Sequence, residues 1–350
     1  MKQSHWKRLI LGCLLFAAAT AVARPPEGGY HQLKKYALSS AEGSTGEYFD
    51  YIYVDSSARR VYLSHGTEVK VISADDGAVV GNIPGFKRDH GIAIASEFGR
   101  GFITDGANGK VSIFDLQTLK VIGDAQAAPD ADGVIYDPAS KHVFVMSGES
   151  KSATVIDAKT GAVVKTVDLG GAPEFAVADG KGMIYINLED KGEVVALDSR
   201  SLEIKSRWPV TPASAPTAIA MDREHRRLFS AGRNPQMLVV MDADTGKVIQ
   251  SFPISAGADA DAYDPETGMV FVSTREGMLH IFHEDSPDKF SVVEAVKTEY
   301  GAKTLGLDTK THKVFVDTAD FGPPPAPTPQ RPHPQPAPIA GTFRVLVYGR

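Results

Sequence analysis

The chain has 350 residues, a formal net charge of -6 at pH 7 and 43% hydrophobic residues, which indicates a folded protein of one large domain or two smaller ones. Its only cysteine is Cys13, so the remainder of the chain forms no disulfides, iron–sulfur clusters or thiolate zinc sites. No run of basic residues indicates nucleic-acid binding. No apolar segment beyond the amino terminus is long enough to predict a membrane span.

The amino-terminal segment has the pattern of a secretory signal peptide. A basic start over residues 2–8 is followed by an apolar run over residues 9–20, which is too short for a transmembrane helix. The small-residue sequence Ala-Val-Ala then matches a cleavage site. We therefore predict cleavage between Ala23 and Arg24, a periplasmic or secreted protein, and one domain over residues 24–350. A membrane anchor and a lipoprotein attached at the single cysteine are the alternatives.

A strand is predicted over residues 31–38, and residues 131–173 then show how the rest of the chain is organised. Within them, four short runs rich in β-branched and aromatic residues are separated by turn-forming Asp, Pro, Gly and Ser. These runs span 133–137, 142–146, 153–157 and 162–167. They predict a four-stranded antiparallel sheet, which has two faces and two edges to cover and therefore needs neighbours.

The same unit recurs along the chain. An aromatic residue occupies the second strand of each copy, at successive spacings of 40, 42, 41, 44, 42 and 44 residues: Tyr62, Phe102, Phe144, Tyr185, Phe229, Phe271 and Phe315. In most copies an aspartate such as Asp137 or Asp157 ends the first or third strand, where a role in turns is expected. A repeat of this length with four strands is typical of a β-propeller.

We therefore predict an all-β, seven-bladed β-propeller with four antiparallel strands in each blade. The expected blades span residues 48–88, 89–130, 131–173, 174–216, 217–259, 260–303 and 304–350. The last copy contains only three strands, so the strand over residues 31–38 is predicted to pair with residues 343–348 as its fourth. This pairing would close the ring and leave no open edge between its first and last blades.

The last copy also carries an insertion between its second and third strands, residues 322–341, with nine prolines from Pro323 to Pro338. Such a segment cannot join a β-ladder and is expected to be extended. Because it leaves the second strand, we expect it over or beside the channel mouth, where Arg331 and His333 could approach acidic groups. A lid or docking arm and a passive insertion are both compatible with this pattern.

Propeller topology predicts a candidate site at one end of the central channel, where the first strands begin. This funnel-shaped mouth would collect carboxylates, imidazoles and arginines: Asp50, His65, His90, Asp132, Glu174, Arg233, Asp259 and Arg275. Carboxylates crowded in a narrow mouth attract a cation or raise each other's pKa. We predict a small-ligand or cation site there, with a solvated channel mouth as the alternative.

A divalent metal ion is the one cofactor that this set of residues suggests. Its candidate ligands are His65, His90, Asp132 and Glu174. The sequence contains no G-x-S-x-G, H-E-x-x-H, Walker or G-x-G-x-x-G motif that would indicate another chemistry.

Several strands resemble those of the YVTN-repeat, or YncE-like, β-propellers, whose repeat joins an aromatic-Val-Thr-Asn second strand to a Val-x-Val-Ile-Asp third strand. The similar runs include residues 101–106, 111–115, 143–145 and 155–157, and the resemblance extends over residues 31–350. It implies an exported seven-bladed propeller.

Two kinds of propeller enzyme share this shape. A quinone cofactor is not expected, because no cysteine follows the signal segment and Trp208 is the one tryptophan beyond it. The His-Pro-rich turns of bacterial lactonases are replaced by turns such as 137–138. We therefore expect a monomeric binding or scaffold protein whose partner at the channel face is a small molecule, a metal or a protein. A lactonase-type hydrolase that uses a divalent metal at the same mouth is the alternative.

Overall fold

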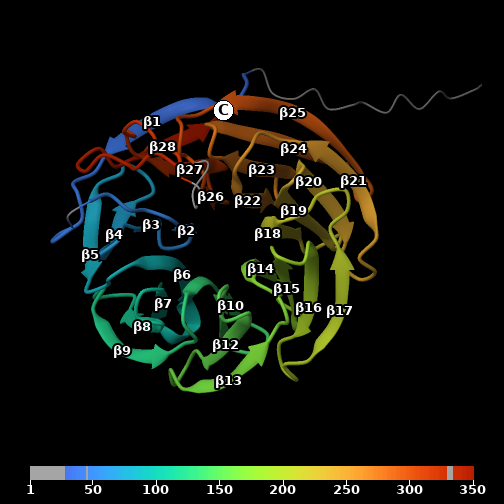
Figure 1. The fold of residues 1–350 in the computed structure, drawn as a ribbon, viewed down its shortest axis with the longest axis horizontal. Coiled ribbons are helices and arrows are strands. Elements are labelled where there is room, and N and C mark those ends of the chain that lie inside the picture. Colours follow the sequence, from blue (N-terminus) through green and yellow to red (C-terminus); the bar gives the residue numbers. More distant parts are fainter. Residues whose placement is uncertain (1–27, 45, 329–333) are drawn as a thin grey trace, which may run out of the picture.

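The computed structural model describes residues 28–44, 46–328 and 334–350. Seven four-stranded antiparallel sheets are arranged around one central axis (Figure 1). The predicted all-β, seven-bladed propeller is therefore confirmed. The predicted signal peptide, with its cysteine, and the side chains of Arg331 and His333 lie outside the described residues. Within the described part, no helix is long and apolar enough to cross a membrane.

Each blade places its first strand next to the axis and its fourth strand at the rim (Figure 1). Blade one contains β2 (Ile52–Asp55), β3 (Arg60–Ser64), β4 (Glu68–Ser73) and β5 (Val79–Pro84). Blade two contains β6 (Asp89–Ala95), the 3-10 helix η1 (Ser96–Phe98), β7 (Arg100–Asp105), β8 (Lys110–Asp115) and β9 (Val121–Gln126). Blade three contains β10 (Ala131–Asp137), β11 (His142–Ser147), β12 (Ser152–Asp157) and β13 (Val163–Asp168).

The remaining blades repeat this order. Blade four contains β14 (Pro173–Ala178), β15 (Met183–Leu188), β16 (Glu193–Asp198) and β17 (Ile204–Pro209). Blade five contains β18 (Pro216–Asp222), β19 (Arg227–Arg233), β20 (Gln236–Asp242) and β21 (Val248–Pro253). Blade six contains β22 (Ala258–Asp264), β23 (Met269–Thr274), β24 (Met278–Ser286) and β25 (Lys289–Lys297). Blade seven contains β26 (Leu305–Asp308), β27 (Lys313–Thr318), β28 (Arg344–Gly349) and β1 (His31–Ala37).

Burial explains why the middle strands are almost continuously apolar. Strand β11 is buried on both faces because a neighbouring blade covers each side, whereas β13 at the rim is mostly exposed. The aromatic side chains that repeat in the second strands are all buried; Phe144, for example, packs with Ala176 and Ile184 of the next blade. Asp137 accepts hydrogen bonds from the backbone N–H groups of Ala139 and Ser140, as predicted for a turn residue.

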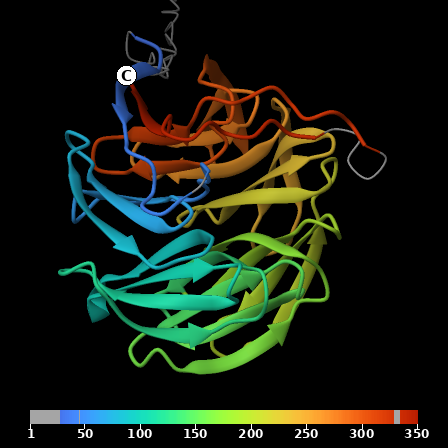
Figure 2. The same ribbon diagram turned by 60° about the vertical axis from the view of Figure 1, so that its left-hand side comes forward.

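The amino-terminal strand closes the ring. Strand β1 pairs antiparallel with β28, from His31 opposite Gly349 to Ala37 opposite Arg344. Both segments therefore lie within one residue of the predicted bounds, and blade seven combines strands from the two ends of the chain (Figure 2). An ion pair between Lys35 and Glu299 adds a contact of β1 with the preceding blade. No described blade is left with fewer than four strands.

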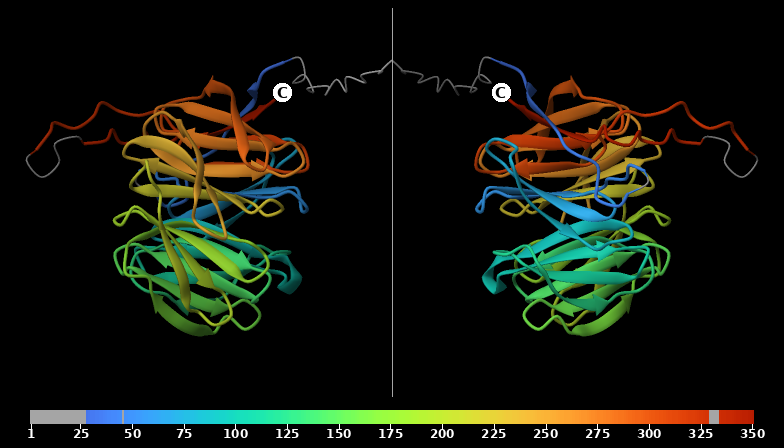
Figure 3. Two further views of the ribbon diagram at one scale, coloured as in Figure 1. Left: turned by 90° about the vertical axis from the view of Figure 1, so that its right-hand side faces the viewer. Right: turned by 90° about the vertical axis from the view of Figure 1, so that its left-hand side faces the viewer.

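The described parts of the proline-rich segment leave the ring beside the channel mouth. Phe321 forms an isolated β-bridge with Pro338, and Gly322 N–H donates to Ala337 O, so the two ends of the segment run antiparallel. The Tyr300 hydroxyl donates to Gln335 Oε1 at 3.2 Å. Figure 3 shows the segment standing out from the ring rather than lying across it.

Candidate functional site

The first strand of each blade begins at the same end of the channel. Polar side chains from the start of these strands, or from the residues just before them, meet there. Six of the eight predicted residues line a single cavity of about 170 Å³: Asp50, Asp132, Glu174, Arg233, Asp259 and Arg275. Tyr51, Phe175 and Lys303 complete its wall. The equivalent position in successive blades therefore brings side chains together that are far apart in the sequence. We refer to this cavity as the mouth.

A tight cluster at the edge of the mouth contains His90, which does not line the cavity itself, with Asp50 and Asp132, which do. His90 Nδ1 lies 2.8 Å from Asp50 Oδ2 and 3.2 Å from Asp132 Oδ1. The Tyr48 hydroxyl donates to Asp50 Oδ2 at 3.0 Å and lies 2.9 Å from His90 Nδ1. The histidine and the two carboxylates each offer one ligand atom, and these atoms all lie within 4.8 Å of one another. Ligand atoms about 3 Å apart suit a cation whose bonds are roughly 2.0–2.2 Å long.

Lys303 neutralises one side of the mouth. Its ammonium group lies 2.8 Å from Asp50 Oδ1 and also contacts Asp259 Oδ2. Arg233 pairs with Asp259 as well, and its Nη1 lies 3.1 Å from Glu189 Oε1. Burial opposes ionisation of Asp50, but Lys303 and His90 together hold the pKa of that carboxyl well below its usual range.

The opposite side of the mouth carries acids with fewer partners. Burial, followed by the charge of Asp50, raises the pKa of Asp132 to about 7. Burial, followed by the charges of Glu189 and Asp132, raises the pKa of Glu174 to about 9. Glu174 forms no ion pair with any described residue, and Asp132 is paired among them with His90 alone, at 3.2 Å from its Oδ1. A cation placed among these groups would relieve their mutual repulsion.

These raised pKa values predict that the protein becomes less stable as the pH rises. The folded state holds protons on Asp132 and Glu174 that the unfolded state releases near pH 4, so their contribution to stability is present at low pH. It is lost progressively up to about pH 7 for Asp132 and about pH 9 for Glu174.

Urea unfolding at pH 5, 7 and 9 in the presence of a chelator measures this loss. Glu174→Gln keeps a neutral side chain and is expected to flatten the pH dependence above pH 5, by at least about 1 kcal/mol at pH 9 relative to the unmodified protein. If the free energy of unfolding depended on pH in the same way in both proteins, Glu174 would not be the cause of the loss of stability.

His65 lies outside the mouth cluster. Its ring stacks on Phe343 with 4.1 Å between centroids, and its Nε2 contacts the carboxylate of Glu47. Glu47 also accepts a hydrogen bond from Gly341 N–H at 2.8 Å. His65 is therefore placed to attach the end of the proline-rich segment to blade one, and it does not join His90 and Asp132.

The structure shows two groups of polar side chains that were not predicted from the sequence. Tyr48 lies in the connection before β2. It occupies none of the positions that recur from blade to blade, so no periodic signal marks it. A second cluster, Asp222, His225 and Glu284, also has ligand atoms within 4.8 Å of one another. His225 Nδ1 lies 2.8 Å from Asp222 Oδ2 and 3.0 Å from Glu284 Oε1. Asp222 ends the first strand of blade five, so the sequence pattern marks it only as one of the recurring turn aspartates, like Asp137.

The fold and the mouth together define a seven-bladed β-propeller with an acidic channel opening. No protein-family model matches the chain. Two curated proteins named YncE are similar to it: that of Salmonella typhi is 27% identical over 172 residues, and that of Salmonella typhimurium strain LT2 is 26% identical over the same length. The similarity covers 44% of this chain and 45% of each relative, so the alignment spans less than half of those proteins. The resemblance to YncE-like propellers inferred from the sequence is thereby confirmed.

Solved structures support the fold alone. A chain of the Kuenenia stuttgartiensis hydrazine synthase superposes with a TM-score of 0.69 at 14% identity, over 79% of this chain and 96% of that one. A chain of a mitotic checkpoint complex superposes with a TM-score of 0.72 at 12% identity, over 97% and 99% of the two chains. At such low identity these proteins say nothing about the activity of this one.

Proposed function

We propose that this protein is an exported binding propeller whose mouth holds a divalent cation through Asp50, His90 and Asp132, beside a cavity that admits a small ligand. The observation that carries the proposal is the convergence of one imidazole and two carboxylates from three blades. Export is proposed from the basic, apolar and small-residue pattern at the amino terminus.

The chemistry of these ligands favours a transition metal such as Zn²⁺. Imidazole suits Zn²⁺, Cu²⁺ and Ni²⁺, whereas sites for Mg²⁺ or Ca²⁺ are built from oxygen atoms. Binding would displace the proton that His90 shares with its acidic neighbours and the proton on Asp132. We therefore expect binding to release protons and the affinity to rise between pH 6 and 8.

Zn²⁺ titration by calorimetry tests the proposal. His90→Gln and Asp132→Asn are each expected to weaken binding at the mouth by at least about tenfold, which corresponds to roughly 1.4 kcal/mol. His225→Gln is the matched control, because it removes an imidazole from the other cluster. That substitution would remove any second binding event and leave the mouth event unchanged.

Binding that persists in both mouth variants but disappears in His225→Gln would contradict the proposal. So would the absence of any Zn²⁺ binding to the unmodified protein at pH 8. A circular-dichroism spectrum and a melting curve for each variant separate the loss of a ligand from the loss of the fold.

One observation favours a hydrolase as the second candidate function. With a pKa of about 7, Asp132 could exchange a proton near neutral pH, and it lies next to His90 at the edge of the mouth cavity. A metal at this position could activate water for attack on a lactone or ester. Zn²⁺-dependent hydrolysis of such substrates that is lost in Asp132→Asn but kept in His225→Gln would support the hydrolase over the binding protein.

A further inference from the structure

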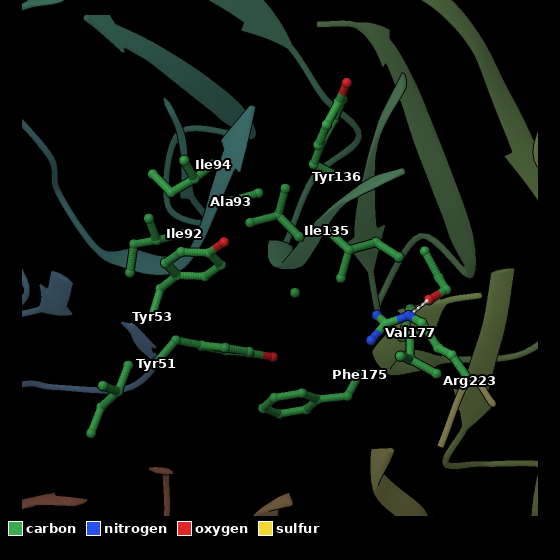
Figure 4. Close-up of a pocket in the computed structure, with 15 residues that line it drawn as sticks. Tyr51, Tyr53, Ile92, Ala93, Ile94, Ile135, Tyr136, Phe175, Val177 and Arg223 are labelled. Atoms are coloured by element: carbon green, nitrogen blue, oxygen red, sulfur yellow. Dashed lines mark hydrogen bonds between the residues drawn. The ribbon is translucent and has the colours of Figure 1, made fainter. Parts of the chain in front are cut away.

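A second cavity of about 350 Å³, which we call the lower cavity, adjoins the mouth (Figure 4). It is lined by the first strands of blades one to four and by Arg223 of blade five. Its wall is aromatic and aliphatic, with Tyr53, Ile135, Phe175 and Val177 all partly exposed to the space. Apolar concave cavities of this size with a few polar groups are the usual form of small-molecule sites.

A pair of aromatic rings separates this cavity from the mouth. Tyr51 and Phe175 stack with 4.6 Å between their centroids and 24° between their planes. Both side chains line both cavities. Gly133 makes room for the pair, because a Cβ there would lie 3.3 Å from the Tyr51 hydroxyl and 3.0 Å from Glu174 O. The lower cavity is therefore bounded on the mouth side by aromatic rings and not by carboxylates.

Arg223 is the cation of the lower cavity, and its charge is not paired. Its Nε donates to Ala178 O at 2.9 Å, a bond that is drawn in Figure 4. No carboxylate of the described residues lies within ion-pair distance of the guanidinium. Asp179, whose charge acts on Arg223, pairs with Arg226 at 3.2 Å, and the neighbouring Asp222 pairs with His225. The guanidinium Nη groups remain as donors toward the cavity.

Two phenol groups add neutral donors. The hydroxyls of Tyr51 and Tyr53 point into the cavity in Figure 4, and neither forms a hydrogen bond with a described residue. Burial raises the pKa of Tyr53 to about 12, so its hydroxyl keeps its proton at neutral pH. The polar groups that face this apolar space are therefore donors, and one of them is a cation.

We propose that the lower cavity binds a small organic carboxylate with an aromatic or branched apolar body, its carboxylate on Arg223 and its body between Tyr53 and the Tyr51–Phe175 pair. Arginine is suited to this role because its planar fork binds a carboxylate through two parallel hydrogen bonds. The apolar body gains by leaving water for an aromatic wall. This site is separate from the proposed cation site and does not depend on it.

Calorimetry with three probes of one shape tests the proposal: 4-phenylbutyrate, 4-phenylbutan-1-ol and 4-phenylbutylamine. We expect the unmodified protein to bind the carboxylate most tightly and the amine most weakly. Arg223→Gln should weaken carboxylate binding at least about tenfold and leave alcohol binding unchanged, because it removes the charge-assisted bonds alone. Arg223 lies at an exposed position, so this change is not expected to affect folding.

Arg200→Gln is the matched control, because Arg200 donates only to the backbone carbonyls of Lys181 and Ala139 outside the cavity. It should bind all three probes as the unmodified protein does. Val177→Trp, which fills the cavity, should abolish binding of both the carboxylate and the alcohol. All titrations include a chelator, so that a metal at the mouth cannot bind the carboxylate.

Three results would overturn the proposal. The first is a failure of the unmodified protein to bind 4-phenylbutyrate. The second is equal carboxylate affinity in Arg223→Gln and the unmodified protein. The third is carboxylate binding that is lost in His90→Gln but kept in Arg223→Gln, which would place the ligand at the mouth. Failure of the cation site alone, seen as absent Zn²⁺ binding with normal 4-phenylbutyrate binding, leaves this site in place.

Discussion

A chain that begins at residue 48 is expected to lose cooperative unfolding. Without β1, the outer edge of β28 has no partner, and the ladder from His31–Gly349 to Ala37–Arg344 is gone. The same deletion removes Tyr30, whose ring packs edge-on against Phe271 at 5.4 Å between centroids, and the buried side chain of Leu38. Blade seven then covers its neighbours incompletely, and the open edge is a template for pairing with other chains.

The comparison is with a chain that begins at residue 24, which keeps β1. Urea unfolding followed by circular dichroism and by tryptophan fluorescence should give one coincident transition for the longer chain. For the shorter chain we expect broad, non-coincident transitions, and larger species in size-exclusion chromatography. A shorter chain with the same midpoint and slope as the longer one would show that blade seven does not need its fourth strand.

Replacement of Lys303 by methionine is expected to lower the free energy of unfolding at pH 7 by about 3 kcal/mol. Loss of one partner from a buried ion pair costs roughly 3–5 kcal/mol, because the other charge stays desolvated. Here two carboxylates lose their shared ammonium, while Asp50 keeps His90 and Asp259 keeps Arg233, so the lower end of that range applies. Methionine fills most of the space of the lysine stem, which limits the effect to the charge.

The pH dependence of this loss identifies its cause. In the unmodified protein, the depressed pKa of Asp50 adds stability above the pKa of the unfolded state, and this stability is lost as the pH falls through the folded-state pKa. The difference between the two proteins should therefore persist from pH 7 to about pH 4 and shrink between about pH 4 and pH 2, measured by urea unfolding with a chelator present. Lys141→Met, which removes an exposed partner of Glu97, should leave stability nearly unchanged. An equal loss at pH 7 and at pH 2 would assign the effect to packing.

The sequence predicted the architecture well because its signal is periodic. Every blade buries its middle strands against neighbouring blades of the same architecture. Aromatic residues such as Phe144 therefore recur at the same position of each repeat. The closing strand could be inferred because the last repeat lacks a fourth strand, and the predicted strand over residues 31–38 belongs to no other repeat. The recurring aspartate marks where each first strand ends. Counting back from it to the start of the strand placed Asp132, Glu174 and Asp259 at one end of the channel.

The parts of the site that could not be predicted depend on side-chain direction and on residues outside the repeat. His65 follows a second strand, and the sequence pattern does not say which way its side chain points; contacts with Glu47 and Phe343 hold it at the blade interface. Tyr48 comes from a connection with no counterpart in other blades. Arg223 follows a strand end, and its unpaired state depends on the partners that Asp179 and Asp222 find elsewhere.

The stacked Tyr51–Phe175 pair has a consequence for any pair of ligands that occupy the two halves of the channel. Tyr51 follows Asp50 and Phe175 follows Glu174 in the chain, so a ligand that displaces the backbone of either aromatic residue would also displace an acidic group of the mouth. If a carboxylate in the lower cavity moves the rings and changes the cation affinity by some factor, the cation must change the carboxylate affinity by the same factor. Binding in one cavity would then change the affinity of the other through two aromatic side chains.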